Sequence, residues 1–174
     1  MRGYRKRPGT QGFSVPLVGA SLFFIISLFL FASYKNSAYQ QAKKEIYSLY
    51  TANRAFDLDE VYQDGLTAIY AKEYGKTATE AGCEALEQTG LPYVLLLSQF
   101  SAPVERVYVT NCQLSETGRE KKARTYDYTV SVRFCLEKGD EVLAPEKTMD
   151  FHGIVVMKKK GWFRWLLDGV TLGE

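Results

Sequence analysis

The chain has few side chains of the kind that catalysis or metal binding requires. In 174 residues it has one histidine, His152, and three cysteines. His152 falls in a segment that we expect to be a strand, and no partners at metal-ligand spacing and no nucleophile–base pair accompany it. We therefore interpret His152 as a partly exposed strand residue, and we expect no metal site, no catalytic site and no cofactor.

One short motif resembles part of a nucleotide site. Gly75-Lys76-Thr77 matches the end of a phosphate-binding loop. That motif needs a glycine five residues before Gly75, where this chain has Tyr70, and it follows a strand, whereas a helix is expected here. We reject a phosphate-binding loop.

The three cysteines are expected to be unpaired. We place Cys112 opposite Tyr126, across a turn near residue 119, and Cys135 on the polar face of its strand. The two Cα atoms would then lie farther apart than the ~7 Å that a disulfide tolerates. Cys83 falls in a helix. A disulfide stays an open alternative, because the domain is expected outside the cytoplasm.

Residues 13–34 contain no charged side chain, and 22–32 are almost wholly Leu, Ile and Phe. A helix of this length reaches roughly 30 Å, enough to cross a bilayer. We predict a single-pass transmembrane helix over 13–34, in contact with lipid, behind a basic cytoplasmic tail over 1–12, with the C-terminal domain outside the cell membrane. A cleaved signal peptide is the alternative, disfavoured by the long apolar run and by the lack of a good cleavage site.

Charge argues against a nucleic-acid partner. The pI is near 8.3. Four of the 22 basic residues lie in the first ten positions, and after Tyr34 there are 18 basic and 20 acidic residues. The basic pI therefore reflects the short tail, and we expect no nucleic-acid-binding surface.

Residues 35–102 are predicted to be helical. Apolar residues recur at spacings of three and four, which indicates an amphipathic helix leading out of the membrane. Asp57 begins a short second helix, Gly65 interrupts it, and a third stripe runs from Leu66 to Tyr74. Thr77 with Glu80 is predicted to form a capping box for a helix that ends at Gly90, and an apolar turn or short helix follows Pro92. The stripe of the first helix comprises Tyr39, Ala42, Ile46, Leu49 and Asn53.

Residues 103–172 are predicted to form strands, because the apolar period changes from 3.6 to 2. Tyr126–Leu136 alternates apolar with polar side chains, as a strand with one buried face does. We expect an α+β domain over 35–174, with helices packed on a curled antiparallel sheet of about four strands. The other strands are predicted at Val104–Leu114, Met149–Lys158 and Trp162–Val170, with turns at Ser115–Lys122, Glu137–Lys147 and Lys158–Gly161.

Two segments carry a resemblance to known proteins. Phe-Asp-Leu-Asp-Glu-Val-Tyr at 56–62, between predicted helices, and Gly-Trp-Phe-Arg-Trp at 161–165 resemble parts of the nuclear transport factor 2-like (cystatin-like) cone fold. The closing hairpin is similar to the N-terminal extension of methicillin-resistance penicillin-binding proteins, but the Ser-x-x-Lys motif of their transpeptidase does not occur. The order of basic tail, anchor and domain resembles the inner-membrane scaffold proteins of type IV secretion.

The resemblance implies a membrane-anchored, non-enzymatic interaction or scaffold domain of the cell envelope, with a protein partner docked on the open sheet face. The alternative is a small-ligand-binding or enzymatic cone, since some enzymes of this fold place an aspartate and tyrosines inside it. Asp64, Asp150 and Tyr128 would be such a set. In that case Tyr62, Tyr128, Phe134 and Phe151 would surround an open cavity.

Trp162 and Trp165 would point to opposite faces of a regular last strand. We expect Trp165 in the core beneath the helices, together with Phe163 and Leu167, and we expect Trp162 and Leu166 on the other face. An exposed tryptophan is a common anchor for a partner. The candidate partner or pocket residues are Trp162, Trp165, Tyr128 and Tyr62.

Overall fold

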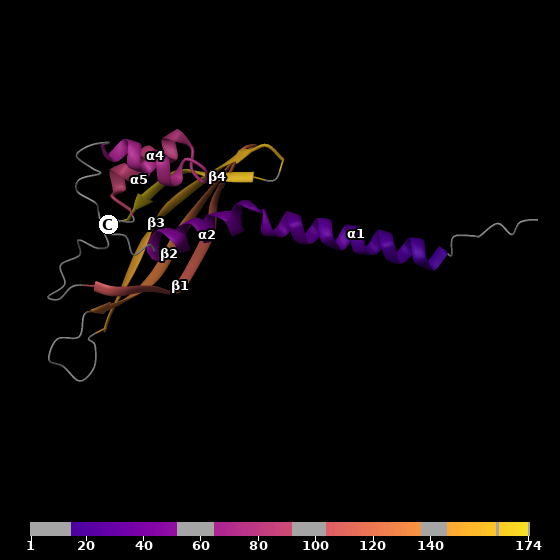
Figure 1. Ribbon diagram of the computed structural model, residues 1–174, viewed down its shortest axis with the longest axis horizontal. Coiled ribbons are helices and arrows are strands. Elements are labelled where there is room, and N and C mark those ends of the chain that lie inside the picture. Colours follow the sequence, from indigo (N-terminus) through magenta and orange to yellow (C-terminus); the bar gives the residue numbers. More distant parts are fainter. Residues whose placement is uncertain (1–14, 52–64, 92–103, 137–145, 163, 174) are drawn as a thin grey trace, which may run out of the picture. The chain divides into compact units, whose positions relative to one another are not determined.

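The computed structural model describes residues 15–51, 65–91, 104–136, 146–162 and 164–173 (Figure 1). The chain divides into two compact units, Met1–Tyr34 and Lys35–Glu174. The predicted short helix at 57–62 and the apolar segment after Pro92 lie outside the described residues.

The first unit contributes one helix, α1, over Val15–Lys35. Pro16 lies in its first turn, where its missing N–H leaves no hydrogen bond unmade. This confirms a helix at the predicted place. No single described helix meets the length and hydropathy expected of a membrane span; Ala20–Lys35 and Ala38–Thr51 do so only as a bent pair.

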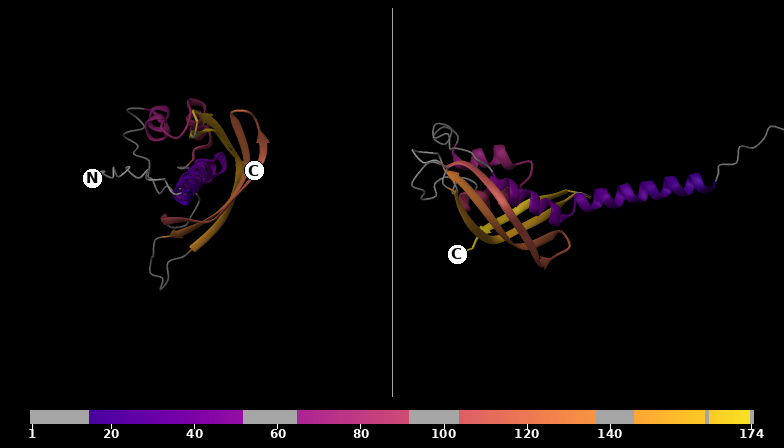
Figure 2. Two further views of the ribbon diagram at one scale, coloured as in Figure 1. Left: turned by 90° about the vertical axis from the view of Figure 1, so that its right-hand side faces the viewer. Right: turned by 90° about the horizontal axis from the view of Figure 1, so that it is seen from below.

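The second unit is a four-stranded antiparallel sheet with three described helices, so the α+β prediction is confirmed. The strands lie in the order β1-β2-β3-β4. Figure 2 shows the sheet curled around α2, with α4 and α5 beside β4. The helices are α2 (Ala38–Thr51), α4 (Leu66–Tyr74) and α5 (Glu80–Thr89), and the strands are β1 (Val104–Arg119), β2 (Ala123–Leu136), β3 (Glu146–Lys160) and β4 (Arg164–Leu172).

The core lies between α2 and the concave face of the sheet. The predicted apolar stripe of α2 is buried at Ala42, Ile46 and Leu49, whereas Tyr39 stays 37% exposed. The alternation predicted for β2 is also confirmed, because its apolar residues are at most 2% exposed while their polar neighbours face outward. Those β2 residues are Tyr126, Tyr128, Val130, Val132 and Phe134.

Gly90 ends α5 as predicted, but one predicted cap is wrong. Gly65 precedes α4 with φ of 77°, and Gly90 ends α5 with φ of 70°. The cap of α5 is Thr79 and not Thr77: the Thr79 hydroxyl accepts a hydrogen bond from the Gly82 N–H. Thr77 is unavailable because its backbone carbonyl accepts from the Leu167 N–H at the edge of β4.

Two predicted turns are also wrong. β1 continues to Arg119, so Ser115–Lys122 is mostly strand and not turn. Register shifts at Val109/Asn111 and Glu116/Gly118 break the apolar alternation and hide this continuation in the sequence. Lys158–Lys160 belongs to β3, and the turn begins at Gly161, whose φ of 73° fits the predicted role of glycine.

Candidate interaction surface at one end of the sheet

The two hairpin turns of the sheet lie side by side. In an antiparallel meander the first and third turns fall at the same end. Here the Lys159 N–H donates to the Lys122 carbonyl at 2.7 Å, and Ala123 pairs with Lys158. The β1–β2 turn and the β3–β4 turn therefore form one continuous tip.

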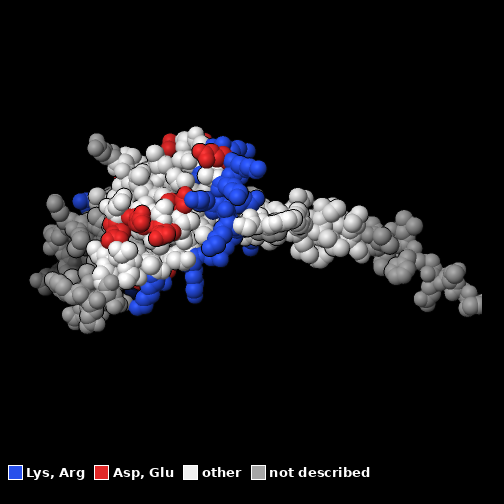
Figure 3. Space-filling model, turned by 90° about the horizontal axis from the view of Figure 1, so that it is seen from above, with Lys and Arg blue, Asp and Glu red and all other residues white. Residues whose placement is uncertain are grey.

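Positive charge is concentrated at this tip. Residues 116–124 and 158–168 contain eight basic and three acidic residues, although residues 35–174 as a whole hold more acidic than basic ones. Figure 3 shows Lys and Arg gathered in a band on one face of the domain, with Asp and Glu both beside this band and away from it. We call this surface the basic end; it comprises Arg119, Lys121, Lys122, Arg124, Lys158, Lys159, Lys160 and Arg164.

Carboxylates neutralise part of the basic end. Glu116 lies 2.5 Å from Arg119 and 3.9 Å from Arg124, and the hydrogen bond from Arg119 holds the pKa of Glu116 below its usual range. Asp168 lies 3.4 Å from the Lys158 ammonium. All residues of the basic end except Arg124 are exposed, so most of the positive charge faces solvent.

The two tryptophans occupy different environments at the basic end. Trp165 is half-buried on the concave face, with the Arg124 guanidinium 5.5 Å and the Lys159 ammonium 5.9 Å from its ring centroid. Trp162 is 85% exposed. It lies in the turn before β4 begins at Arg164, so its exposure comes from the turn and not from strand alternation.

The faces predicted for the last strand are confirmed: Trp165 and Leu167 pack on the core cluster, and Leu166 lies on the other face. Leu166 is 3% exposed although it points away from the core cluster. It is covered because the segment leading into α5 pairs with the outer edge of β4, with Ala78 opposite Leu167. Phe163 lies outside the described residues.

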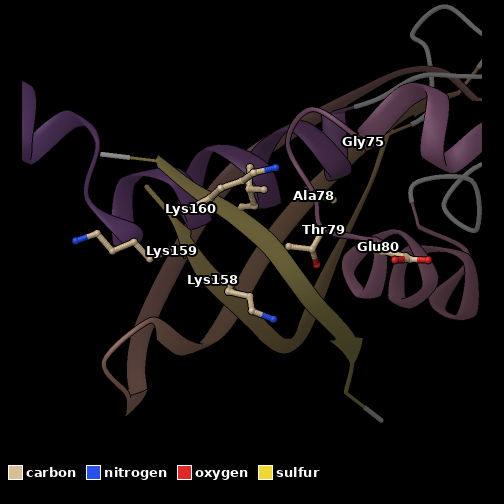
Figure 4. A pocket seen from close by; sticks show the side chains of 8 residues that line it. Gly75, Ala78, Thr79, Glu80, Lys158, Lys159 and Lys160 are labelled. Atoms are coloured by element: carbon tan, nitrogen blue, oxygen red, sulfur yellow. The ribbon is translucent and has the colours of Figure 1, made fainter. Parts of the chain in front are cut away.

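A pocket of about 430 Å³ opens beside the basic end, between β3 and the start of α5 (Figure 4). Lys158 and Lys160 extend to one side of β3 and Lys159 to the other, as strand alternation requires. The Thr79 hydroxyl donates to Asp168 at 2.6 Å and accepts from the Gly82 N–H, so it caps α5 and links the start of that helix to β4. The lining residues are Gly75, Ala78, Thr79, Glu80, Lys158, Lys159, Lys160 and Leu166.

The aromatic candidates inside the cone pack against one another. The ring centroids of Tyr50 and Phe151 are 5.3 Å apart, and those of Phe134 and Phe151 are 6.4 Å apart. Tyr128 is 2% exposed, and its hydroxyl donates to the Thr171 carbonyl at 3.1 Å. Tyr128 is therefore a core residue, while Tyr62 lies outside the described residues.

The set proposed for an enzymatic cone is not assembled. Tyr128 faces the core, whereas Asp150 pairs with Ser131 and is exposed on the opposite face of the sheet. Asp64 lies outside the described residues. His152 is an exposed residue of β3, as predicted. Within the described segments, no three His, Cys, Asp or Glu side chains converge as metal ligands would.

All three cysteines are free thiols, as predicted, although the register differs from the expected one. Cys112 pairs with Val130 and not with Tyr126, because β1 extends further before it turns. Cys135 pairs with Arg106 on the opposite face of the sheet. Burial raises the pKa of the Cys83 and Cys112 thiols, and Cys135 is partly exposed.

Sequence reasoning identified Trp162 and Lys158–Lys160 but missed the rest of the basic end. The signal was present, since two basic runs flank the first and third predicted turns, and a meander brings those turns together. The net charge of residues 35–174 is slightly negative, because acidic residues elsewhere in the domain offset the basic residues of this end. The net charge therefore gave no sign of the basic end.

Comparisons with known proteins return structural neighbours only. No family model and no curated protein matches the chain. One solved structure, described as an Ntf2-like protein involved in plasmid conjugation, has 12% identity and a TM-score of 0.43; the alignment covers 79% of this chain, and the chain spans half of that protein's length. A periplasmic fragment of TraM has 10% identity and a TM-score of 0.38, with 79% of this chain and 96% of the fragment covered.

Proposed function

We propose that this chain is a membrane-anchored, non-enzymatic interaction domain of the cell envelope, built on a nuclear transport factor 2-like cone. The apolar helix holds the domain at the membrane, and the domain binds other components through its outer surface. The N-terminal tail lies in the cytoplasm and the domain lies outside.

The observation that carries this proposal is the surface of α1. Its large apolar side chains are exposed all around the helix, from Leu22 at 58% and Phe23 at 74% to Phe31 at 56%. A helix that is apolar on every side is stable only when buried in protein or lipid. With no charge from 13 to 34, lipid is the environment that fits these side chains.

The interior of the domain supports surface binding. Its described concave face is filled by its own side chains, with Phe151 packed against both Tyr50 and Phe134. Charged groups and the exposed Trp162 lie on the outside, at the basic end. This distribution favours recognition by the outer surface over a reaction inside the cone.

Alkaline extraction of membranes tests the anchor. The full chain should stay in the membrane pellet, whereas a variant with Ile25→Asp and Leu28→Asp should appear in the supernatant, because carboxylates at the centre of a span are costly. Thr129→Asp, on the exposed side of β2, is the matched control and should stay in the pellet. Release of the unmodified chain would contradict the anchor.

Cross-linking in intact membranes tests the interaction. Lysine-reactive cross-linkers should join the folded domain to a defined envelope protein. Recovery of the chain alone, under conditions that capture known envelope complexes, would contradict an interaction role.

Thiol labelling tests the orientation. A membrane-impermeant maleimide should label Cys135 in cells whose cytoplasmic membrane is intact, because Cys135 is partly exposed while Cys83 and Cys112 are buried. Cys135→Ser should abolish labelling and serves as the control. Labelling that appears only after the membrane is permeabilised would reverse the orientation.

A further inference from the structure

We propose that the basic end binds anionic phospholipid headgroups of the membrane in which the chain is anchored. This inference rests on the proposed anchor and adds a second contact with the same bilayer, made by the folded domain. It assigns Lys121, Lys122 and Lys160 to phosphate-rich headgroups and Trp162 to the boundary between headgroups and acyl chains.

The first argument is where the chain enters the domain. α2 begins at Ala38, and the ring of Tyr39 lies 6.0 Å from that of Tyr126, edge to face. Tyr126 pairs with Glu116, close to the β1–β2 turn. The domain therefore begins at the same end of the sheet as the basic end.

The second argument is chain length. The apolar segment ends at Tyr34 and the buried part of α2 starts at Ala38. Four residues span at most about 14 Å even when fully extended. When 13–34 crosses a bilayer, the start of α2, and with it this end of the sheet, cannot lie far from the headgroup layer. Because salt screens exposed charges beyond a Debye length of roughly 8 Å at physiological ionic strength, the attraction acts only where the basic end approaches the headgroups this closely.

The third argument is the kind of side chain exposed there. A cluster of lysines and arginines beside a membrane attracts anionic lipid. Trp162 is 85% exposed and is flanked in sequence by Lys160 and Arg164. Tryptophan is enriched at membrane–water interfaces, where its apolar ring and its N–H each find a suitable environment. Lipid headgroups satisfy both the charge and the exposed ring.

The opposite end of the sheet supplies a contrast. Among the described residues the basic ones are fewer there, and Arg133 lies 3.8 Å from Glu146. Arg106 pairs in register with Cys135, and Lys147 pairs with Phe134, at the same end as Arg133. These three residues carry the same total formal charge as Lys121, Lys122 and Lys160. They lie far along the strands from the start of α2.

The test uses the full chain reconstituted in nanodiscs of phosphatidylcholine, either alone or mixed with phosphatidylglycerol. Each disc includes a lipid with a nitroxide on its headgroup, which quenches nearby tryptophan fluorescence. The difference between the unmodified chain and Trp162→Phe reports Trp162 alone. Quenching of Trp162 should be at least about twofold greater in discs that contain phosphatidylglycerol than in discs of phosphatidylcholine alone. This quenching should decrease at high salt.

Charge reversal supplies the control. Lys121→Glu, Lys122→Glu and Lys160→Glu together should reduce Trp162 quenching to the level of phosphatidylcholine alone. Arg106→Glu, Arg133→Glu and Lys147→Glu together should leave it unchanged. Circular dichroism of both triple variants checks that the domain stays folded.

The outcomes separate this inference from the proposed function. A chain that co-purifies with nanodiscs but shows equal Trp162 quenching in both lipid mixtures keeps its anchor and overturns the headgroup contact, which leaves the basic end to a protein partner. Equal loss of quenching in the two triple variants also overturns it, because the effect would then follow net charge and not position. A chain that does not enter nanodiscs contradicts the anchor and this inference together.

Discussion

The hydroxyl oxygens of Tyr50 and Tyr128 lie 3.0 Å apart inside the domain. Tyr128 donates its own proton to the Thr171 carbonyl at 3.1 Å, so Tyr50 is the donor to Tyr128. This relay joins α2, β2 and β4 through polar groups within an apolar core. Its position ties α2, the first helix of the second unit, to two strands of the sheet.

Removing the relay should destabilise the domain in a graded way. Tyr128→Phe leaves the Tyr50 hydroxyl and the Thr171 carbonyl without their partner, and we expect a loss of about 2–3 kcal/mol. Tyr50→Phe removes only the first donor and should cost about 1 kcal/mol. Urea denaturation of both variants and of the double variant measures the coupling. Strictly additive losses would contradict a direct hydrogen bond.

The same tyrosines should make the domain sensitive to alkali. Burial raises the pKa of Tyr50 and Tyr128 above the ordinary value of 10. In the unfolded chain these phenols ionise near pH 10, whereas in the folded chain they keep their protons, so the unfolded state binds fewer protons above that pH. The contribution of these two tyrosines to the free energy of unfolding should therefore be constant below pH 9 and fall above pH 10, by at most about 1.4 kcal/mol per pH unit for each of them.

Tyr50→Phe provides the test of this pH dependence. Because phenylalanine does not ionise, the variant should lose less stability between pH 9 and 11 than the unmodified chain does. Tyr108→Phe is the matched control, since Tyr108 is 45% exposed. This substitution should leave the slope of stability against pH unchanged. The comparison needs urea denaturation at several pH values. Parallel curves for all three chains would show that other groups cause the alkaline loss.

The tryptophans at the basic end should differ in their contribution to stability. Trp165 packs against the core cluster and lies beside two cations, so Trp165→Ala should cost about 2–3 kcal/mol, less than for a fully buried tryptophan. Trp162→Ala should change stability by less than about 0.5 kcal/mol, because the ring is 85% exposed. Thermal melts decide between them, and a larger loss for Trp162 would contradict the register of the hairpin.

The parts of this fold that sequence alone predicted are those set by periodicity. The buried stripe of α2 through Ala42 and Leu49 and the alternation of β2 both follow from which side chains avoid water. Neither depends on distant contacts, because each pattern is complete within its own element.

The features that sequence alone missed depend on tertiary pairing. Thr77 has the spacing of a cap, but its backbone carbonyl accepts a hydrogen bond from the Leu167 N–H of β4. The helix therefore begins only after Thr79. The length of β1 was hidden by bulges, and the burial of Leu166 follows from the parallel bridge between Ala78 and Leu167. The basic end likewise exists only because two turns meet.

The contact between α5 and β4 should be sensitive to added volume. A Cβ on Gly82 would lie well inside contact distance of the Leu167 carbonyl oxygen, which also accepts from the Thr79 N–H. Because both partners are backbone, Gly82→Ala has to separate α5 from the sheet, and we expect a loss above about 3 kcal/mol. Gly169→Ala, whose Cβ would meet Val156 at an ordinary 3.7 Å, should cost less than about 1 kcal/mol. Equal melting temperatures for the two variants would contradict this packing.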